Sequence, residues 1–154
     1  MNLDGTIGEY MKKDPIVVTP ETSLREVASQ MAEKGKDVVV VRDAADIVRG
    51  LVTASDLFGA MRSYVLGKDL LEQLPNDIRD VQVQEIMRGT KAEEFMEACG
   101  LRGTNLCITL GEWDSVLNAV RVMALGGVDH ILIIGEGGIL GTLSDNDLIK
   151  AFNK

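Results

Sequence analysis

Two stretches of this chain, GLVTASDL at residues 50–57 and GTLSDNDL at residues 141–148, have the same layout. Each has a glycine, two apolar or small residues, a hydroxyl residue, two spacers and an aspartate. Upstream of both stretches, a helical pattern with an apolar stripe recurs 92 residues later in the chain. The second copy is one residue shorter in the turn before the glycine, so the motifs themselves recur after 91 residues. The agreement on both sides of that deletion indicates an internal duplication.

Each copy predicts the same order of elements. In the first copy, Ser23 and Glu26 form a capping-box pattern and Gly35 is a stop signal, which predicts a helix over 23–34. Strands are predicted over 16–19, between two prolines, and over 38–41 and 47–53, with a helix beginning at Ser55 or Asp56. In the second copy, strands are predicted over 107–110, 130–134 and 139–144, with helices beginning at 114 or 115 and over 147–152.

A short helical pattern precedes each copy, because residues 83–87 echo residues 7–11. We therefore place the first motif at 1–61, a linker at 62–82 and the second motif at 83–154. The second motif carries an insertion at about 88–105. The pattern also predicts short helices at 70–74, in the linker, and at 92–99, in the insertion. The insertion is either a plain surface segment or a lid or partner contact.

Composition excludes several classes of partner. The chain has 154 residues, 45% of them hydrophobic, which is enough for one domain or two small halves. Its net charge of −8 disfavours nucleic acid and anionic membrane surfaces as partners. The N-terminus lacks a signal-peptide pattern and no apolar window could span a membrane, so we expect a cytoplasmic protein. Cys99 and Cys107 fit reduced thiols better than a metal site or a disulfide.

Catalysis has little support in the sequence. The chain contains one histidine, His130, and no supported arrangement of nucleophile, base and orienting acid. The glycine clusters at 126–127 and 135–138 do not have the spacing of a phosphate-binding loop. We therefore predict a non-enzyme with no catalytic residues, no catalytic cofactor and no metal site. The rival hypothesis of a small enzyme would depend on His130, Asp56 or Asp147.

The doubled motif, with matched helices and entry segments, resembles the CBS-domain family, as a stand-alone tandem pair or Bateman module. The resemblance implies an α/β fold of two β-α-β-β-α motifs, packed by pseudo-twofold symmetry through small mixed sheets. It also implies three-stranded sheets, two related clefts, and association of two pairs into a disc. Independently, a copy of about 60 residues is too small to bury both faces of its apolar strands alone.

In such pairs the clefts bind adenosine-containing ligands, and the resemblance implies a role for the motif residues. Asp56 and Asp147 would accept hydrogen bonds from a ribose diol, while Thr53 and Ser144 would meet ribose or phosphate oxygen. The positions implied to contact ligand are Thr19, Val38, Thr53, Ser55, Asp56, Thr109, His130, Ile131, Ser144, Asn146 and Asp147. The alternative is that the hydroxyl and acidic residues before each helix only cap it.

Few cations accompany these positions. His130 offers the clearest positive charge, and the other candidates are Lys36, Arg42, Arg49 and Lys150. A triphosphate would therefore meet an acidic protein with little compensation, whereas AMP, adenosine or cationic S-adenosylmethionine is easier to accommodate.

The predicted function is a regulatory module that binds an adenosyl ligand, AMP-like by preference, and signals to a separate protein partner. The alternatives are a ligand-free dimerisation or interaction scaffold and an S-adenosylmethionine sensor. A homodimer is predicted because the helices after the motif aspartates carry more apolar residues than one pair can bury. These residues are Leu57, Phe58, Met61, Leu148, Ile149 and Phe152.

Overall fold

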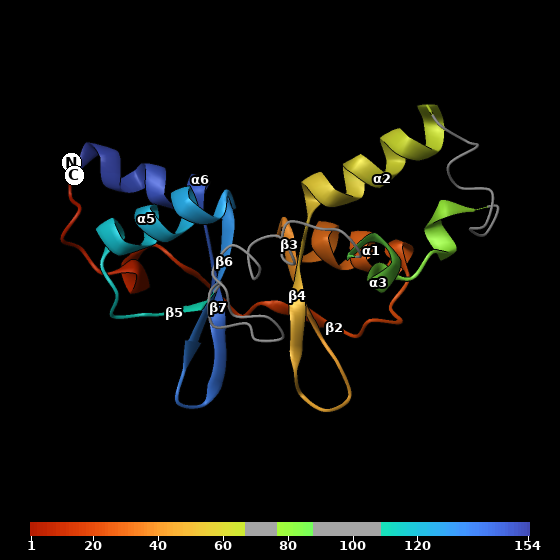
Figure 1. The fold of residues 1–154 in the computed structure, drawn as a ribbon, viewed down its shortest axis with the longest axis horizontal. Helices are drawn as coiled ribbons and strands as arrows, with labels where there is room; N and C mark the ends of the chain where they lie inside the picture. The colour runs from red at the N-terminus through yellow and green to blue at the C-terminus, as the bar shows by residue number, and fades with distance from the viewer. Residues whose placement is uncertain (67–76, 88–108) are drawn as a thin grey trace. The chain divides into compact units, whose positions relative to one another are not determined.

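The computed structural model describes residues 1–66, 77–87 and 109–154 and contains two compact units (Figure 1). Residues 16–66 and 77–87 form the unit that we name the Asp56 unit, and residues 1–15 and 109–154 form the Asp147 unit. The predicted helices at 70–74 and 92–99, the insertion at 88–105, Cys99 and Cys107 lie outside the described residues.

The Asp56 unit has a three-stranded mixed sheet in the order β2-β3-β4, with β2 parallel to β3 and β3 antiparallel to β4. Helices α1 and α2 cover the same face of this sheet (Figure 1). Its elements are β2 (Ile16–Val18), α1 (Leu24–Lys34), β3 (Val38–Arg42), β4 (Val48–Thr53), α2 (Ala54–Leu66), η3 (Ile78–Asp80) and α3 (Val83–Met87).

The Asp147 unit repeats this arrangement and adds a strand at one edge. The sheet order is β1-β7-β6-β5, with only β5 and β6 parallel. Its elements are η1 (Ile7–Glu9), β1 (Lys12–Lys13), β5 (Thr109–Gly111), α5 (Val116–Gly126), β6 (His130–Gly135), β7 (Gly138–Ser144), α6 (Asp145–Leu148) and η5 (Ile149–Asn153). The predicted α/β class with two small mixed sheets is confirmed, but this sheet has four strands instead of the three implied by the resemblance.

The duplication is visible in the caps of the first helix of each copy. The Ser23 hydroxyl accepts the Glu26 N–H at 3.2 Å, and the Ser115 hydroxyl accepts the Asn118 N–H at 3.0 Å. Both helices end at a glycine in the left-handed region, with φ near 62° at Gly35 and 63° at Gly127. Glycine has no Cβ to penalise this conformation, so both stops are local consequences of the sequence.

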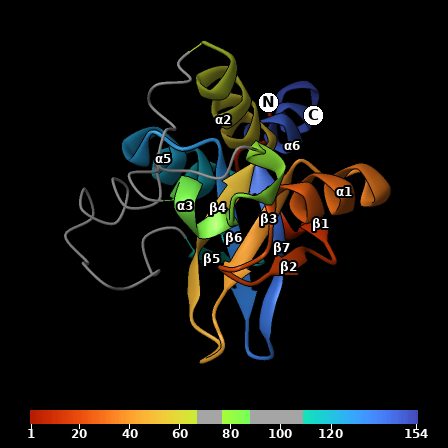
Figure 2. The same ribbon diagram turned by 90° about the vertical axis from the view of Figure 1, so that its right-hand side faces the viewer.

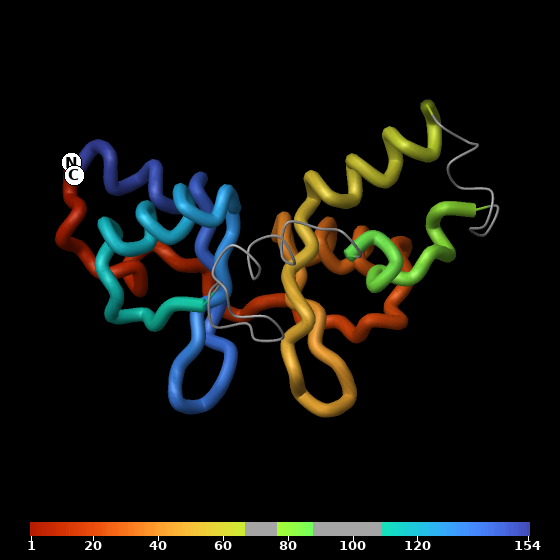
Figure 3. The backbone as a smooth tube through the Cα atoms, viewed as in Figure 1, coloured from red at the N-terminus to blue at the C-terminus, as the bar shows by residue number. Residues whose placement is uncertain are grey.

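The entry segments of the two copies are exchanged between the compact units. Ile7, which precedes the first copy, is buried in the core of the Asp147 unit, while Val83, which precedes the second, is buried in the core of the Asp56 unit. The backbone repeats this pairing: the Ile7 N–H donates to the Asp114 carbonyl, and the Leu24 N–H donates to the Val81 carbonyl, both at 2.9 Å. Figure 3 allows the N-terminal segment to be followed from the chain end past α5 to β7.

The compact units are defined by contacts, whereas the predicted motif boundaries follow the repeat along the sequence, so the two divisions differ. The motif boundaries stay a prediction. Helix α2 also continues to Leu66, past residue 61, where the first motif is predicted to end. In the predicted linker, the carboxylate of Asp77 accepts a hydrogen bond from Arg79 Nε at 2.9 Å. It also lies 3.8 Å from the guanidinium of Arg25 in α1, and this ion pair joins η3 to α1. The Arg79 hydrogen bond lowers the pKa of Asp77 to about 2.

The burial of Ile7 predicts that a substitution before the first copy destabilises the Asp147 unit, which contains the second copy. Replacing the fully buried Ile7 with alanine removes core contacts of the Asp147 unit, so Ile7→Ala should lower the free energy of unfolding by about 2–5 kcal/mol. Chemical denaturation monitored by circular dichroism measures this change. Ile47→Ala, at a half-exposed isoleucine, is the matched control and should change stability by well under half as much. Equal effects would contradict the assignment of Ile7 to a core.

Candidate functional site

The two repeated motifs form the junctions between the last strand and last helix of each copy. In the Asp147 unit, the Asp147 N–H donates to Ser144 Oγ at 3.1 Å and the Ser144 N–H donates to Asp147 Oδ2 at 2.9 Å, a complete capping box. In the Asp56 unit, the Asp56 N–H donates to Thr53 Oγ1 at 3.2 Å and the Thr53 N–H donates to Asp56 Oδ2 at 2.8 Å. The hydroxyl residue is therefore the cap, and the aspartate is the third helical residue that closes the box.

This geometry partly corrects the interpretation of the aspartates as residues that open the helix. Capping is real, but it engages only Oδ2 of each carboxylate and holds the side chain in a fixed orientation. The second oxygen, Oδ1, lies outside the box in both motifs. Capping and ligand recognition are consequently compatible at Asp56 and Asp147.

The two junctions differ in burial and charge. Asp147 is 3% exposed, whereas Asp56 is only partly buried. A buried carboxylate is costly unless hydrogen bonds or an opposite charge compensate it. The compensating charge at Asp147 is Lys12, whose Nζ lies 3.7 Å from Asp147 Oδ1.

Strand β1 brings Lys12 to this junction. It pairs antiparallel with β7, with Lys12 opposite Thr142 and Lys13 opposite Gly141, as Figure 2 shows for the two strands. A Cβ at Gly141 would lie 2.0 Å from the Lys12 carbonyl oxygen, which no side chain tolerates. The glycine of the repeated motif therefore permits the backbone of β1 to approach β7.

Lys12 is not among the site residues predicted from the sequence, although the sequence contains a signal for it. A basic residue follows each of the two matching entry segments, Lys12 after Met11 and Arg88 after Met87. Arg88 lies outside the described residues. Only the sheet pairing shows that the residue after the first entry segment reaches the motif of the second copy.

The structure brings several predicted residues together within each unit. Val38 is opposite Thr53 in the β3–β4 register, and His130 is opposite Ser144 in the β6–β7 register. His130 is largely buried, and its Nδ1 lies 3.0 Å from Asp129 Oδ1. The spacers Ser55 and Asn146 are exposed in the first turn of the following helix.

Three further predicted residues take no part in the capping boxes. Thr19 follows β2 at the end of the sheet away from Thr53, because Val18 is level with Val41 and Thr53 with Val38. Thr109 is level with Leu132, which makes it the counterpart of Val17 instead of Thr19. Ile131 belongs to the core cluster of the Asp147 unit. Strand register places Thr19 away from the first motif. In the second copy, however, Ile131 lies opposite Leu143, and Thr109 is level with Leu132, which lies opposite Thr142, so both are beside the strand part of the motif.

Two of the expected cations are also elsewhere. Arg42 pairs with Asp46 at 3.7 Å and Arg49 with Asp43 at 2.7 Å, at the hairpin turn between β3 and β4. The Ile47 N–H and then Arg49 hold the pKa of Asp43 below its ordinary value. These ion pairs stabilise the turn, at the far end of the strands from Thr53.

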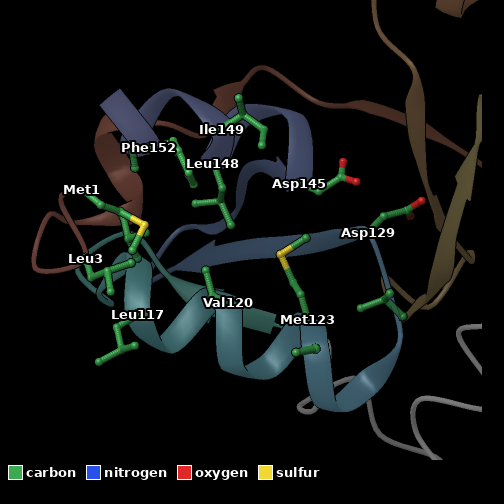
Figure 4. Close-up of a pocket in the computed structure, with 14 residues that line it drawn as sticks. Met1, Leu3, Leu117, Val120, Met123, Asp129, Asp145, Leu148, Ile149 and Phe152 are labelled. Atoms are coloured by element: carbon green, nitrogen blue, oxygen red, sulfur yellow. The ribbon is translucent and has the colours of Figure 1, made fainter. Parts of the chain in front are cut away.

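An apolar groove of about 530 Å³ lies in the Asp147 unit between α5 and the C-terminal helices (Figure 4). Val120, Ile149 and Phe152 line it and are more than 40% exposed, and the carboxylates of Asp129 and Asp145 lie at one end. Of the residues predicted to form a dimer surface, Leu57 and Leu148 instead pack partly buried against the cores. The exposed apolar surface is therefore smaller than the sequence indicated.

Among the residues that the structure describes, no helix is long and apolar enough to cross a bilayer. No cluster of histidine, cysteine, aspartate or glutamate in the same part of the chain is suited to hold a metal ion.

Comparison with known proteins decides the family. The CBS domain model matches residues 7–63 and 107–154, which together are more than half of the chain. The chain belongs to the CBS-domain family. The strand-to-helix junctions described above are thus the repeated ends of two CBS motifs. A comparison with curated proteins found no match.

Solved structures with this fold agree with the assignment. A conserved protein from Pyrococcus horikoshii is 28% identical and has a TM-score of 0.68, with 100% of this chain and 96% of that one covered. CBSX2 in complex with AMP is 17% identical, with a TM-score of 0.63 and 96% of each chain covered. The CBS pair of protein MJ0100, in complex with methylthioadenosine and S-adenosylmethionine, is 16% identical, with a TM-score of 0.67 and coverage of 97% and 96%.

The close approach of β1 at Gly141 predicts that alanine is costly to stability at this glycine but not at a nearby glycine in open space. Gly141→Ala places a Cβ against the Lys12 carbonyl, so β1 must move, and we expect a loss of about 1–3 kcal/mol in the free energy of unfolding. Urea denaturation followed by circular dichroism measures it. Gly137→Ala, in the turn of the same hairpin with no atom within 4 Å of its Cβ position, is the control and should change stability little. A loss at Gly137 as large as at Gly141 would contradict the role of β1.

Proposed function

We propose that this chain is a regulatory CBS module that binds an adenosyl ligand, AMP-like by preference, at the motif aspartates and reports it to a protein partner. The observation that carries the proposal is the geometry of each capping box. Oδ2 of Asp56 and Asp147 holds the strand-to-helix junction, while Oδ1 lies outside the box. A carboxylate oriented in this way can accept hydrogen bonds from the two hydroxyls of a ribose.

The structures of related folds support this choice of ligand class. CBSX2 was solved with AMP and the MJ0100 pair with methylthioadenosine and S-adenosylmethionine, and all three ligands contain adenosine. AMP fits the Asp147 unit best, because Lys12 supplies a positive charge beside the carboxylate. An S-adenosylmethionine sensor is the main alternative.

A regulatory role follows from linkage. CBS-domain pairs are generally regulatory instead of catalytic, and a ligand that binds one conformation better than another shifts the population toward it. The output then passes through a partner protein or through self-association. A scaffold that binds no nucleotide is the remaining rival.

Homodimerisation is part of the proposal. The groove beside α5 exposes Phe152 and Ile149, each more than 60% accessible, while α2 exposes Phe58 and Met61. Exposed apolar side chains of this size, gathered on neighbouring turns, are typical of interaction surfaces. A second copy of the chain offers the same apolar residues for a closed symmetric contact.

The ligand proposal predicts selective loss of affinity when the carboxylate charge is removed. Asn at position 147 or 56 can still accept the backbone N–H of the cap, so Asp147→Asn and Asp56→Asn should keep the fold. Each should weaken AMP binding at its own motif roughly ten- to hundredfold, because an amide replaces a charged acceptor. Isothermal titration with AMP, ADP, ATP, NAD, S-adenosylmethionine and GMP measures this.

Asp46→Asn is the control, since it removes an exposed charge at the β3–β4 turn, at the far end of the strands from Thr53. Its AMP affinity should stay within about twofold of the unsubstituted protein. No binding of any adenosyl compound at millimolar concentration would favour the scaffold. Unchanged affinity in both asparagine variants and in the double variant would exclude recognition by these aspartates.

The dimer proposal predicts a mass of twice 16.7 kDa in light scattering at micromolar concentration. Phe152→Glu places a charge in the groove and should return the protein to its monomer mass, because burying an unpaired charge is costly. Leu125→Glu, at an 86% exposed position of α5 that does not line the groove, should leave the dimer intact. A monomer mass for the unsubstituted protein would defeat the proposal.

A further inference from the structure

Lys12 lies where its positive charge would interact with a ligand bound at the Asp147 junction. Its Nζ lies 3.7 Å from Asp147 Oδ1, the oxygen that the capping box does not use. The Lys12 side chain is 40% exposed, although the carboxylate that it faces is almost completely buried. The ammonium therefore lies between the buried acceptor and solvent, where it can face a bound ligand as well.

Two further carboxylates lie near this junction in the part of the chain that the structure describes. Asp129 and Asp145 flank the same strand-to-helix junction, where the Asp145 N–H donates to the Asp129 carbonyl at 3.0 Å. His130 lies beside the Asp129 carboxylate. Without Lys12, a ligand at this junction would meet three carboxylates, which favours a cationic ligand over an anionic one.

The position of Lys12 is set by backbone structure and not by its long side chain alone. The pairing of β1 with β7 fixes its Cα opposite Thr142, and Gly141 allows the two strands to approach. Successive side chains of a strand point to opposite faces, so Lys13 does not share this position. Lys12 therefore lies at the junction, and the neighbouring Lys13 is directed to the other face of the strand.

We propose that Lys12 sets the ligand preference of the Asp147 junction in favour of an adenosyl compound with a 5′-phosphate over neutral adenosine and cationic S-adenosylmethionine. The inference rests on the proposed function, since it assumes that Asp147 binds the ribose diol. The 5′ substituent is attached to that same ribose, so an ammonium beside the diol acceptor attracts a phosphate and repels a sulfonium. Because the Lys12 side chain is only partly exposed, salt screens its charge less than it would at a fully exposed position.

The test compares affinities for AMP, adenosine and S-adenosylmethionine by isothermal titration. Lys12→Met keeps the apolar stem and removes the charge, Lys12→Arg keeps the charge, and Lys13→Met removes the neighbouring charge on the same strand. Each is made in the unsubstituted protein and with Asp56→Asn, which isolates the Asp147 junction. Melting curves verify that each variant is folded.

Lys12→Met should lower the ratio of AMP affinity to adenosine affinity about tenfold and raise the relative affinity for S-adenosylmethionine. Lys12→Arg and Lys13→Met should keep the ratio within about threefold of the parent. In the parent itself, raising the KCl concentration should weaken AMP binding more than adenosine binding, which tests the charge effect even if Lys12→Met does not fold.

An equal fall in AMP and adenosine affinity in Lys12→Met would overturn the proposal, because Lys12 would then only position Asp147. An unchanged ratio, or an equal effect of Lys13→Met, would overturn it as well. If adenosyl ligands bind with any of these results, the proposed function stands and only the role of Lys12 fails. If the unsubstituted protein binds none of the three ligands at millimolar concentration, the proposed function fails and this inference fails with it.

Discussion

The pairing of β1 with the Gly141 edge of β7 is the constraint on which the candidate site depends. Because Gly141 has no side chain, the N-terminal segment can lie against the last strand of the second copy. That contact delivers Ile7 to the core of the Asp147 unit and Lys12 to the motif aspartate. One missing side chain thus couples the stability of the unit to the electrostatics of its site.

The duplicated motif has the same backbone geometry in both copies but differs in burial and in neighbouring charge. Thr53 with Asp56 and Ser144 with Asp147 close equivalent capping boxes, and the first residue of each following helix donates to an aspartate carbonyl, that of Asp37 or Asp129. Asp147 is more deeply buried than Asp56 and has a lysine partner. Two junctions that share a backbone can therefore differ in ligand preference, because affinity depends on the surrounding charge and burial.

Exchange of the entry segments makes the two compact units differ from the two sequence copies. Each core is completed by residues that precede the other copy in sequence, Ile7 in one and Val83 in the other. Each core therefore depends on a segment that lies outside its own sequence copy, and a closely packed core is sensitive to the loss of any such side chain.

The sequence by itself determined the features that depend on neighbouring residues. The capped helices at Ser23 and Ser115, the glycine stops, the apolar strands and the repeated junctions all follow from local propensity and periodicity, and they suffice for the fold class and family. Only the tertiary structure decided the exchange of the entry segments, the position of Lys12 beside Asp147, and the separation of Thr19 from Thr53. Those facts depend on strand register and on contacts between residues far apart in the chain, which no local pattern specifies.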